Sequence, residues 1–247
     1  MRRDVYTLRD FYASALGRTV RDVVAGKLTE AWGEARGLDV LGLGYATPWL
    51  HLFRPTARRV VAAMPAQQGA EVWPSETRNA VALAGEAALP FTNALFDRVL
   101  MVHALEESGD ALAHLAEAHR VMAPSGRLVV VAAARRGMWS RAEHTPFGFG
   151  RPFTRGQLAQ LLREAELEPT AWSRALFTPP VGWLARWPEF WEGTGAWAYP
   201  PFAGLTLIEA VKRTFAPTAR APAAVRVKVA RPGVLQPAPA LREPPTR

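Results

Sequence analysis

A glycine-bearing turn is the first feature of the sequence whose residue types could bind a ligand. Residues 38–46 read LDVLGLGYA, a short apolar run that ends in glycine. Because glycine has no Cβ, such a turn lets the backbone approach a ligand closely. In a doubly wound sheet a turn of this kind lies at the carboxyl edge, where ligands bind. We therefore expect Gly42, Gly44 and Tyr45 to border a ligand site.

The histidines are the main candidates for proton transfer. His144 lies in RAEHTPFGFGRPF (141–153), directly after the last clear apolar run, and is either a general base or a surface-loop residue. His103 is either functional or a satisfied core histidine. His114 and His119 fall on a predicted helix, where we expect them to be solvated, and their spacing of five does not suit two ligands of one metal ion.

Motifs for metal ions, nucleophiles and phosphate loops are absent from the sequence. It holds no cysteine, no H-E-x-x-H, no Walker-type G-K-S/T and no G-x-S-x-G. The nicotinamide pattern G-x-G-x-x-G also fails, because residues 45–48 read YATP. We expect no metal site.

Alternating apolar runs and helical patterns must position these candidates. Residues 4–36 read as a pair of amphipathic helices, since apolar side chains recur three and four positions apart. Short apolar runs predict strands at 38–43, 59–64, 79–84, 96–102 and 127–134. Helical spacing predicts helices from about residue 47, at 108–121 and at 154–165. Apolar strands that alternate with helices predict an α/β fold with a doubly wound, mostly parallel sheet.

The segment 172–203 differs from the rest because it is rich in tryptophan and proline. Its five tryptophans are Trp172, Trp183, Trp187, Trp191 and Trp197. The segment is either an irregular layer packed on the sheet edge or an aromatic lid or partner surface, because large aromatic residues anchor ligands and interfaces. Residues 204–211 read GLTLIEAV and predict one more strand.

The positive charge is concentrated at the carboxyl end. The formal net charge of the 247-residue chain is +8, and residues 216–247 contribute +5 of it. These residues include seven prolines and no aromatic residue, so we expect a disordered or extended tail behind a domain of residues 1–215. The tail is either a solvated extension or a weak electrostatic tether to an acidic partner, nucleic acid or anionic membrane. The remaining charge does not indicate a nucleic-acid-binding body.

Targeting signals and membrane spans are not evident either. No apolar run approaches the ~20 residues that cross a bilayer, and the N-terminus lacks the hydrophobic region of a secretory signal. We therefore expect no membrane span and a cytoplasmic location.

Four segments occur in a characteristic order between residues 35 and 170. They are GLG at 42–44, LPF and FDRV within 89–99, VHALE at 102–106 and RVMAPSGRL at 120–128. In this order the chain resembles class I S-adenosylmethionine-dependent methyltransferases, particularly the branch of the ubiquinone and menaquinone biosynthesis enzymes. The RVMAPSGRL turn is the most specific match. The resemblance implies a Rossmann-like methyltransferase fold with S-adenosyl-L-methionine as its cofactor.

The resemblance also implies where the cofactor would lie. Residues after the first strand would line its methionine part: Gly42, Gly44 and Tyr45. Residues after the third strand would meet the adenine edge: Glu86 and Ala87. His103, after the fourth strand, would lie beneath the pocket.

The ribose end departs from the pattern of that family. Its second strand usually ends in an acid that accepts both ribose hydroxyls, but here the strand ends at Met64 and Pro65. Gln67 or Gln68 would have to substitute, and a neutral amide accepts hydrogen bonds more weakly than a carboxylate. The acid expected two residues before the first glycine is also displaced, to Asp39.

Two functions from different classes remain open at this point. The leading hypothesis is methyl transfer to a small-molecule acceptor, in which alignment supplies most of the catalysis and His144 is the candidate base. The missing acid favours the alternative of a catalytically degenerate methyltransferase fold that binds or scaffolds a protein partner through the tryptophan-rich segment or the basic tail. A nucleic-acid methyltransferase rests only on the basic tail.

Overall fold

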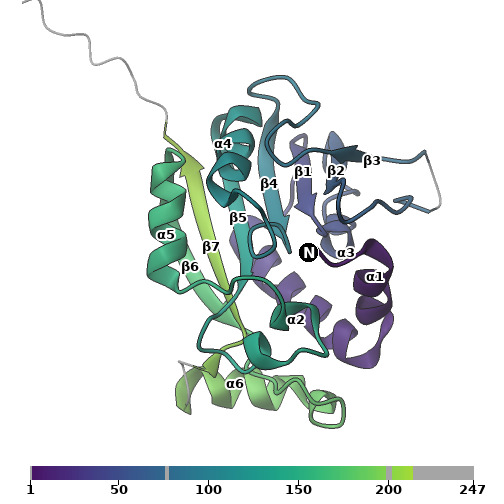
Figure 1. Cartoon of the computed structure of the whole chain (residues 1–247), viewed down its shortest axis with the longest axis vertical. Helices are drawn as coiled ribbons and strands as arrows, with labels where there is room; N and C mark the ends of the chain where they lie inside the picture. The colour runs from purple at the N-terminus through teal and green to yellow at the C-terminus, as the bar shows by residue number, and fades with distance from the viewer. Residues whose placement is uncertain (1, 76–77, 199–201, 214–247) are drawn as a thin grey trace, which may run out of the picture. The chain divides into compact units, whose positions relative to one another are not determined.

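The computed structural model describes residues 2–75, 78–198 and 202–213 (Figure 1). The compact unit of the chain spans Met1–Thr214. The predicted tail at 216–247 lies outside the described residues, so its disorder and the exact domain boundary stay predictions.

A seven-stranded sheet in the order β3-β2-β1-β4-β5-β7-β6 forms the centre of the compact unit (Figure 1). The five strands β1 to β5 run parallel, and β7 runs antiparallel to both β5 and β6. The bounds of the strands are β1 Asp39–Gly44, β2 Arg59–Pro65, β3 Val81–Ala84, β4 Phe96–Val102, β5 Met122–Ala133, β6 Leu167–Ala175 and β7 Leu205–Lys212. This arrangement confirms the predicted α/β class and the predicted strand at 204–211.

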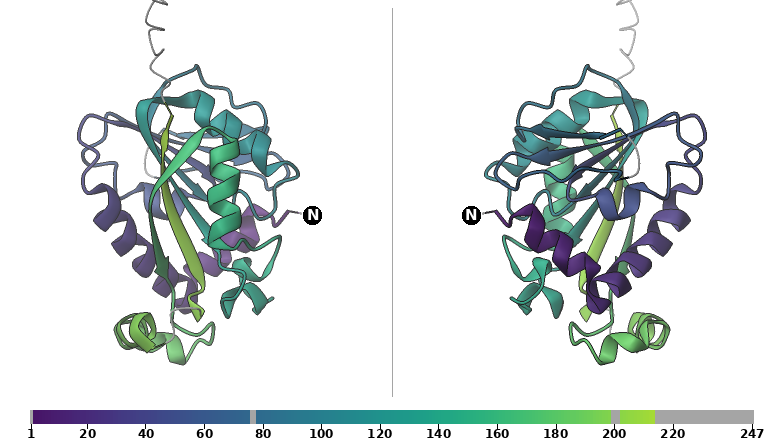
Figure 2. Two further views of the ribbon diagram at one scale, coloured as in Figure 1. Left: turned by 90° about the vertical axis from the view of Figure 1, so that its left-hand side faces the viewer. Right: turned by 90° about the vertical axis from the view of Figure 1, so that its right-hand side faces the viewer.

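Helices cover both faces of the sheet (Figure 2). One core lies under α1 (Val5–Ala13), α2 (Ala15–Trp32) and α3 (Thr47–Leu50), and the other under α4 (Ala111–Val121) and α5 (Arg155–Glu164). Because successive strand residues point to opposite faces, Val40 belongs to the first core and Leu41 to the second. This burial on both faces explains the unbroken apolar runs of the strands. No helix in the described part of the chain is both long and apolar enough to span a membrane.

The two N-terminal helices begin where the sequence supplies caps. The Asp4 side chain accepts the backbone N–H of Thr7 at 2.9 Å, and the Ser14 hydroxyl between the helices accepts that of Gly17 at 3.0 Å. A Cβ at Gly17 would lie 2.0 Å from the carbonyl oxygen of Phe11. Glycine therefore permits the close turn between α1 and α2, which confirms the predicted helix pair.

Several elements differ from the sequence-based expectations. Strand β6 was not predicted, because an edge strand exposes much of its length and this one accommodates Pro169 at a shift of register. The helix expected from residue 47 is only the four residues of α3. The tryptophan-rich segment is not wholly irregular, since it contains α6 (Pro188–Ala198). Short 3-10 turns occupy Trp139–Arg141, Pro146–Gly148 and Leu184–Arg186.

The expectation that His114 and His119 are solvated is wrong for His114. Its side chain lies on the inner face of α4, beside Leu115 and Ala118, and is buried. Burial lowers the pKa of His114 to about 4, so the imidazole is neutral near pH 7. His119 is partly buried, and burial also lowers its pKa.

Candidate functional site

The carboxyl ends of β1 to β4 bring the predicted cofactor residues to one edge of the sheet. Gly44 ends β1, and Gly42 and Met64 lie within the last three residues of β1 and β2. The other predicted residues follow β1, β2, β3 and β4 directly or within a few positions: Tyr45, Gln68, Glu86, Ala87 and His103. His144 lies further along, in the loop after β5.

The glycine turn after β1 packs tightly against its neighbours. Gly44 has φ +77°, and a Cβ there would lie 2.2 Å from the carbonyl oxygen of Val102. That oxygen accepts the backbone N–H of Tyr45 at 2.8 Å. At Gly42 a Cβ would lie 2.7 Å from the side chain of Leu50. Both glycines are therefore required for packing, whatever ligand the edge holds.

Gln68 is buried over this turn. Its side-chain amide nitrogen donates to the carbonyl oxygen of Gly44 at 3.4 Å, and its backbone carbonyl oxygen accepts the backbone N–H of Val5 at 2.8 Å. Gln68 thereby ties the segment after β2 to both the glycine turn and the start of α1. Met64 is fully buried in the first core.

Three rings, those of Tyr12, Tyr45 and His103, pack together where α1 meets the sheet edge. Tyr12 lies parallel to Tyr45, with centroids 5.7 Å apart, and the Tyr12 hydroxyl is 2.7 Å from Nε2 of His103. Burial lowers the pKa of His103 to about 3 and raises the pKa of Tyr12, so both are neutral near pH 7. His103 also packs on Phe147, with centroids 4.6 Å apart. His103 is thus a buried, hydrogen-bonded histidine below α1.

A carboxylate that the sequence reasoning missed lies at the glycine turn. Glu71, in the loop after β2, accepts the Thr47 hydroxyl at 3.0 Å. The pKa of Tyr45 is raised above its ordinary value, mainly by burial and next by the charge of Glu71. No local pattern marks Glu71, because only the path of the loop returns it to this edge.

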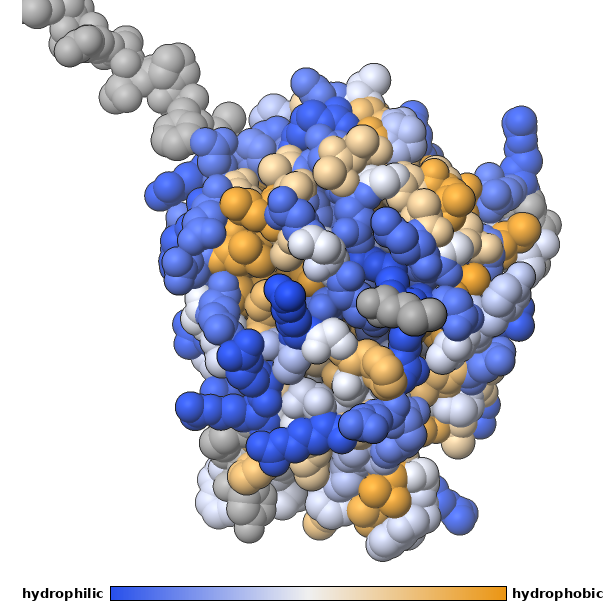
Figure 3. Space-filling view, in the orientation of Figure 1, coloured by the Kyte–Doolittle hydropathy of each residue, from blue (hydrophilic) through white to orange (hydrophobic). Residues whose placement is uncertain are grey.

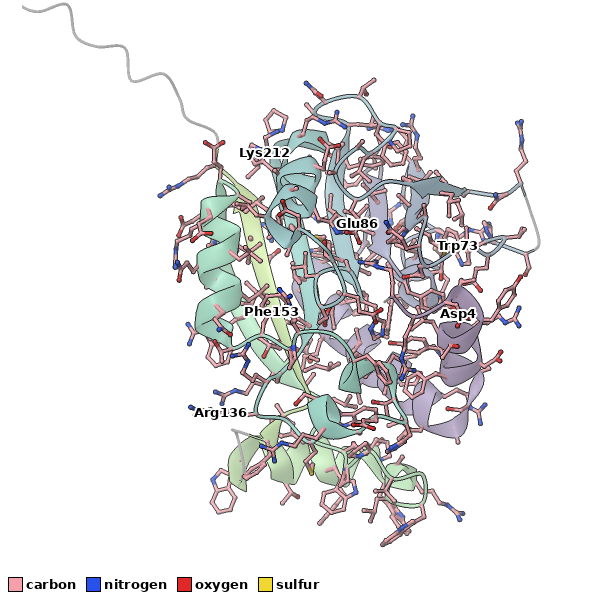
Figure 4. The ribbon with its side chains drawn as sticks, viewed as in Figure 1. Asp4, Trp73, Glu86, Arg136, Phe153 and Lys212 are labelled. Carbon is pink, nitrogen blue, oxygen red and sulfur yellow. The ribbon has the colours of Figure 1, made fainter. Side chains whose placement is uncertain are left out.

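A cavity of about 300 Å³ opens beside Glu71. It combines two guanidinium groups, one carboxylate, hydroxyls and aromatic rings, from Arg9, Tyr12, Ala13, Arg21, Tyr45, Thr47, Pro48, His51, Glu71 and Trp73. Figure 4 shows Trp73 on the same side of the molecule as the start of α1, which Asp4 marks. The carboxylate can accept hydrogen bonds from hydroxyl groups, and the guanidinium groups can bind a carboxylate. The aromatic residues can contact another aromatic ring.

Glu86, which was predicted to meet the adenine of the cofactor, already has partners within the protein. Its carboxylate pairs with the guanidinium of Arg2 and accepts the Ser108 hydroxyl at 2.7 Å. Arg2 also donates to the carbonyl oxygen of Ala104 at 3.0 Å. One guanidinium nitrogen of Arg2 and Nδ1 of His114 are buried without a hydrogen-bond partner. The hollow beside Glu86 is too small for a water molecule, and Ala87 is exposed next to it.

Arg3 also fastens the N-terminal segment across this edge of the sheet. The Arg3 backbone N–H donates to the Glu107 carboxylate at 2.5 Å, and its side chain donates to the carbonyl oxygen of Glu143 at 3.0 Å. The guanidinium carbon lies 3.6 Å from the ring centroid of Phe149. The N-terminal segment therefore connects the ends of β3 and β4 to the loop after β5.

His144 does not join the cluster at the ends of β1 to β4. It is exposed in the loop after β5, and its Nε2 lies 2.8 Å from the carbonyl oxygen of Pro180. The contact links that loop to the tryptophan-rich segment. A role for His144 as a base stays a prediction. The described residues also contain no group of three or more side chains that could hold a metal ion.

Asp39, the displaced acid of the first strand, has a structural partner. It is buried, and both of its carboxylate oxygens accept from Arg58, at 2.9 and 2.6 Å. The hydrogen bonds from Arg58 hold the pKa of Asp39 below its ordinary value of 3.8. Asp39 therefore fastens the start of β1 and does not face the cavity.

Replacing Asp39 by asparagine should lower the free energy of unfolding at pH 7 by roughly 2 kcal/mol, the usual contribution of a hydrogen bond to a charged group. Because the folded-state pKa of Asp39 is lowered, this stabilisation is present above about pH 4 and is lost as the pH falls through the folded-state pKa. Urea unfolding of both proteins at pH 7 and near pH 3 measures it, with exposed Asp10→Asn as the control. Equal stability at pH 7 would contradict the role.

A family model described as a methyltransferase domain matches residues 38–130. No curated protein matches the chain. The matched segment runs from the start of β1 into β5 and so includes the glycine turn and the ends of β2, β3 and β4.

Solved structures share the fold at low sequence identity. A SAM-dependent methyltransferase from Thermotoga maritima has a TM-score of 0.60 at 18% identity, over 83% of this chain and 94% of that chain. A chain from the Haloferax volcanii complex of the Trm112 methyltransferase activator with a methyltransferase scores 0.58 at 18% identity, over 84% and 98%. The 1,6-didemethyltoxoflavin-N1-methyltransferase of Burkholderia thailandensis, with bound S-adenosylhomocysteine, scores 0.52 at 19% identity, over 83% and 82%. These similarities confirm a Rossmann-like class I methyltransferase fold. They do not show the predicted membership of the ubiquinone-type branch.

Proposed function

We propose that the chain is a methyltransferase that moves a methyl group from S-adenosyl-L-methionine to a small-molecule acceptor. The matching domain and the fold indicate S-adenosyl-L-methionine as the cofactor. When bound, the cofactor supplies an electrophilic methyl group on a sulfonium, which a nucleophilic atom of the acceptor takes, leaving S-adenosylhomocysteine. The domain match does not favour the alternative of a binding or scaffolding protein.

The observation that carries the proposal is the position of Glu71. The second strand lacks a terminal acid, yet the loop behind it returns a carboxylate to the glycine turn, 3.0 Å from the Thr47 hydroxyl. Each carboxylate oxygen can accept more than one hydrogen bond, so Glu71 keeps acceptor capacity beside its contacts with Thr47 and Tyr45. Glu71 therefore has the chemistry to accept the two hydroxyls of a ribose.

The other residues of the cavity also fit this cofactor. Arg9 and Arg21 offer guanidinium groups for a carboxylate such as that of the methionine part. Tyr12, Tyr45 and Trp73 supply aromatic surface. Holding a charged sulfonium and its acceptor in line, away from water, is the main catalytic task of such a site.

The acceptor side is assigned to the loop after β5 and the tryptophan-rich segment. His144 and Pro180 join these two parts. His144 remains the candidate base for an acceptor that is protonated at neutral pH. The identity of the acceptor, a protein partner at the tryptophan-rich segment and a cytoplasmic location belong to this proposal as predictions.

Replacing Glu71 by glutamine should weaken the binding of S-adenosylhomocysteine about tenfold or more, because the charged acceptor of the ribose hydroxyls is lost. The free energy of unfolding should change by less than about 1 kcal/mol, since the glutamine carbonyl still accepts from Thr47. Calorimetric titration of the wild type and the Glu71→Gln protein measures the affinity. The exposed Glu34→Gln variant is the control, because it makes an equal change of charge.

Equal affinity of the wild type and the Glu71→Gln protein would exclude Glu71 as the ribose acceptor. A tenfold loss in the Glu34→Gln protein as well would mean that net charge, not the site, determines the affinity.

A further inference from the structure

A second cavity lies at the same sheet edge, beyond β5. Its volume is about 480 Å³. Its lining comes from the end of β5, the start of α5, the end of β6 and the start of β7: Ala134, Arg135, Arg136, Phe153, Thr154, Arg155, Gly156, Arg174 and Thr206. Strands β1 and β5 are separated only by β4, so the two cavities belong to strands about 10 Å apart.

Four of the nine lining residues are arginines, and none is acidic. No ion pair joins Arg135, Arg136, Arg155 or Arg174 to a carboxylate within residues 2–75, 78–198 and 202–213. Figure 3 shows strongly hydrophilic residues over the lower left of this face, where Figure 4 labels Arg136. Four positive charges around one hollow repel one another unless an anion lies between them.

Two of the arginines are oriented by the same aromatic ring. The guanidinium carbon of Arg155 lies 4.0 Å from the ring centroid of Trp172, and that of Arg174 lies 5.1 Å from it. A third, Arg135, donates from Nε to the carbonyl oxygen of Pro152 at 3.1 Å. Three of the four exposed arginines are thus oriented by contacts of their own.

A threonine also lines the same cavity. Thr206 is 7% exposed, and its hydroxyl makes no hydrogen bond to any residue that the structure describes. Because the hydroxyl oxygen is not fully buried, it can donate a hydrogen bond to an anion in the cavity.

The ten-residue helix α5 adds a further group of donors. Its Thr154 and Gln157 cap each other, which leaves the first backbone N–H groups, at Arg155 and Gly156, unused. Beyond the chain around it, nothing lies within 4 Å of a Cβ built on Gly156, and both residues line the cavity.

We infer that this cavity binds a small molecule through a phosphate or diphosphate group, held by the four arginines, the α5 N-terminus and the Thr206 hydroxyl. Guanidinium groups match the oxygens of a phosphate in pairs, and a diphosphate carries enough negative charge to balance most of the cluster. The volume exceeds that of the anion alone, so an organic part of the ligand has room beside it. A compact hollow suits a small ligand better than the extended backbone of a nucleic acid.

We further assign this ligand as the methyl acceptor, and that assignment rests on the proposed function. Binding of the phosphoryl group itself does not, because it involves none of the residues around Glu71. The two can therefore fail separately: loss of S-adenosylhomocysteine binding would overturn the methyltransferase, and loss of phosphoryl binding would overturn the anion site.

Inorganic pyrophosphate is the probe for the anion site. Calorimetric titration at constant ionic strength should show one saturable site in the wild type. In the Arg136→Gln/Arg174→Gln double variant the affinity should fall at least tenfold. In the control Arg18→Gln/Arg36→Gln, which makes the same charge change on α2 and the loop before β1, it should stay within twofold. S-adenosylhomocysteine binding should be the same in all three proteins.

Three outcomes with pyrophosphate would overturn the inference. They are no pyrophosphate binding up to ~10 mM by the folded wild type, an affinity that the double variant retains, and an equal loss in the control pair. A single-stranded oligonucleotide is the last probe in this experiment. If the oligonucleotide binds more tightly than pyrophosphate and displaces it, the cavity is part of a nucleic-acid surface and not a small-molecule site.

Discussion

Replacing Gly44 by alanine should destabilise the protein by about 4 kcal/mol or more. An L-residue in the left-handed region costs roughly 1–2 kcal/mol, and Gly44 has φ +77°. The added Cβ would also lie 2.2 Å from the Val102 carbonyl oxygen, which is held in the sheet by its bond from Tyr45. Losses of this size are exceptional and need such a steric cause. Chemical denaturation monitored by circular dichroism measures the effect.

The matched control is Gly26→Ala. Gly26 lies inside α2, and no atom lies within 4 Å of a Cβ built there. Alanine at that position should stabilise the helix by up to about 1 kcal/mol. A Gly44→Ala protein as stable as Gly26→Ala would contradict the packing of β1 on β4. The result also bears on cofactor studies, because a larger residue at Gly44 would unfold the site instead of testing it.

Replacing Trp139 by alanine should lower the free energy of unfolding by about 3–5 kcal/mol, the usual range for a buried tryptophan. Trp139 is fully buried in the loop after β5, and its Nε1 donates to the Thr178 carbonyl oxygen at 2.7 Å. Its ring packs edge-on to Phe147 and fills the space left by Gly204. One side chain therefore connects the loop after β5, the start of the tryptophan-rich segment and β7.

Two variants separate packing from hydrogen bonding at this position. Trp139→Phe should lose less than Trp139→Ala, because it keeps most of the ring but leaves the Thr178 carbonyl without its donor. Trp187→Ala removes a tryptophan that is 58% exposed and should change stability by less than about 0.5 kcal/mol. If Trp139→Ala behaves like Trp187→Ala, the loop after β5 is not anchored as described.

The layered fold could be predicted from the sequence because buried parallel strands have a strong signature. Runs such as RVVAAM and RLVVVAAA are apolar on both faces, and both are strands in the structure. The amphipathic pattern of residues 4–36 likewise corresponds to α1 and α2. Strand β6 was not predicted, because it is an edge strand whose polar residues face solvent and whose proline falls at a shift of register.

The site was less predictable because its key contacts are long-range. Glu71 meets Thr47 only through the path of the loop after β2, and Arg2 meets Glu86 across 84 residues. The four arginines of the second cavity come from three separate segments, none of which forms a basic motif. Residue types at single strand ends did bring the candidates to one edge of the sheet. Which groups face one another there depends on loops, and loop paths have no simple sequence period.

The central claim, that this edge binds S-adenosyl-L-methionine, is tested most directly by calorimetric titration of the folded wild type with S-adenosylhomocysteine. We expect one site per chain with micromolar affinity, and competition by S-adenosyl-L-methionine. Absence of binding up to ~1 mM by protein that unfolds cooperatively would contradict the claim and leave a methyltransferase fold without its cofactor.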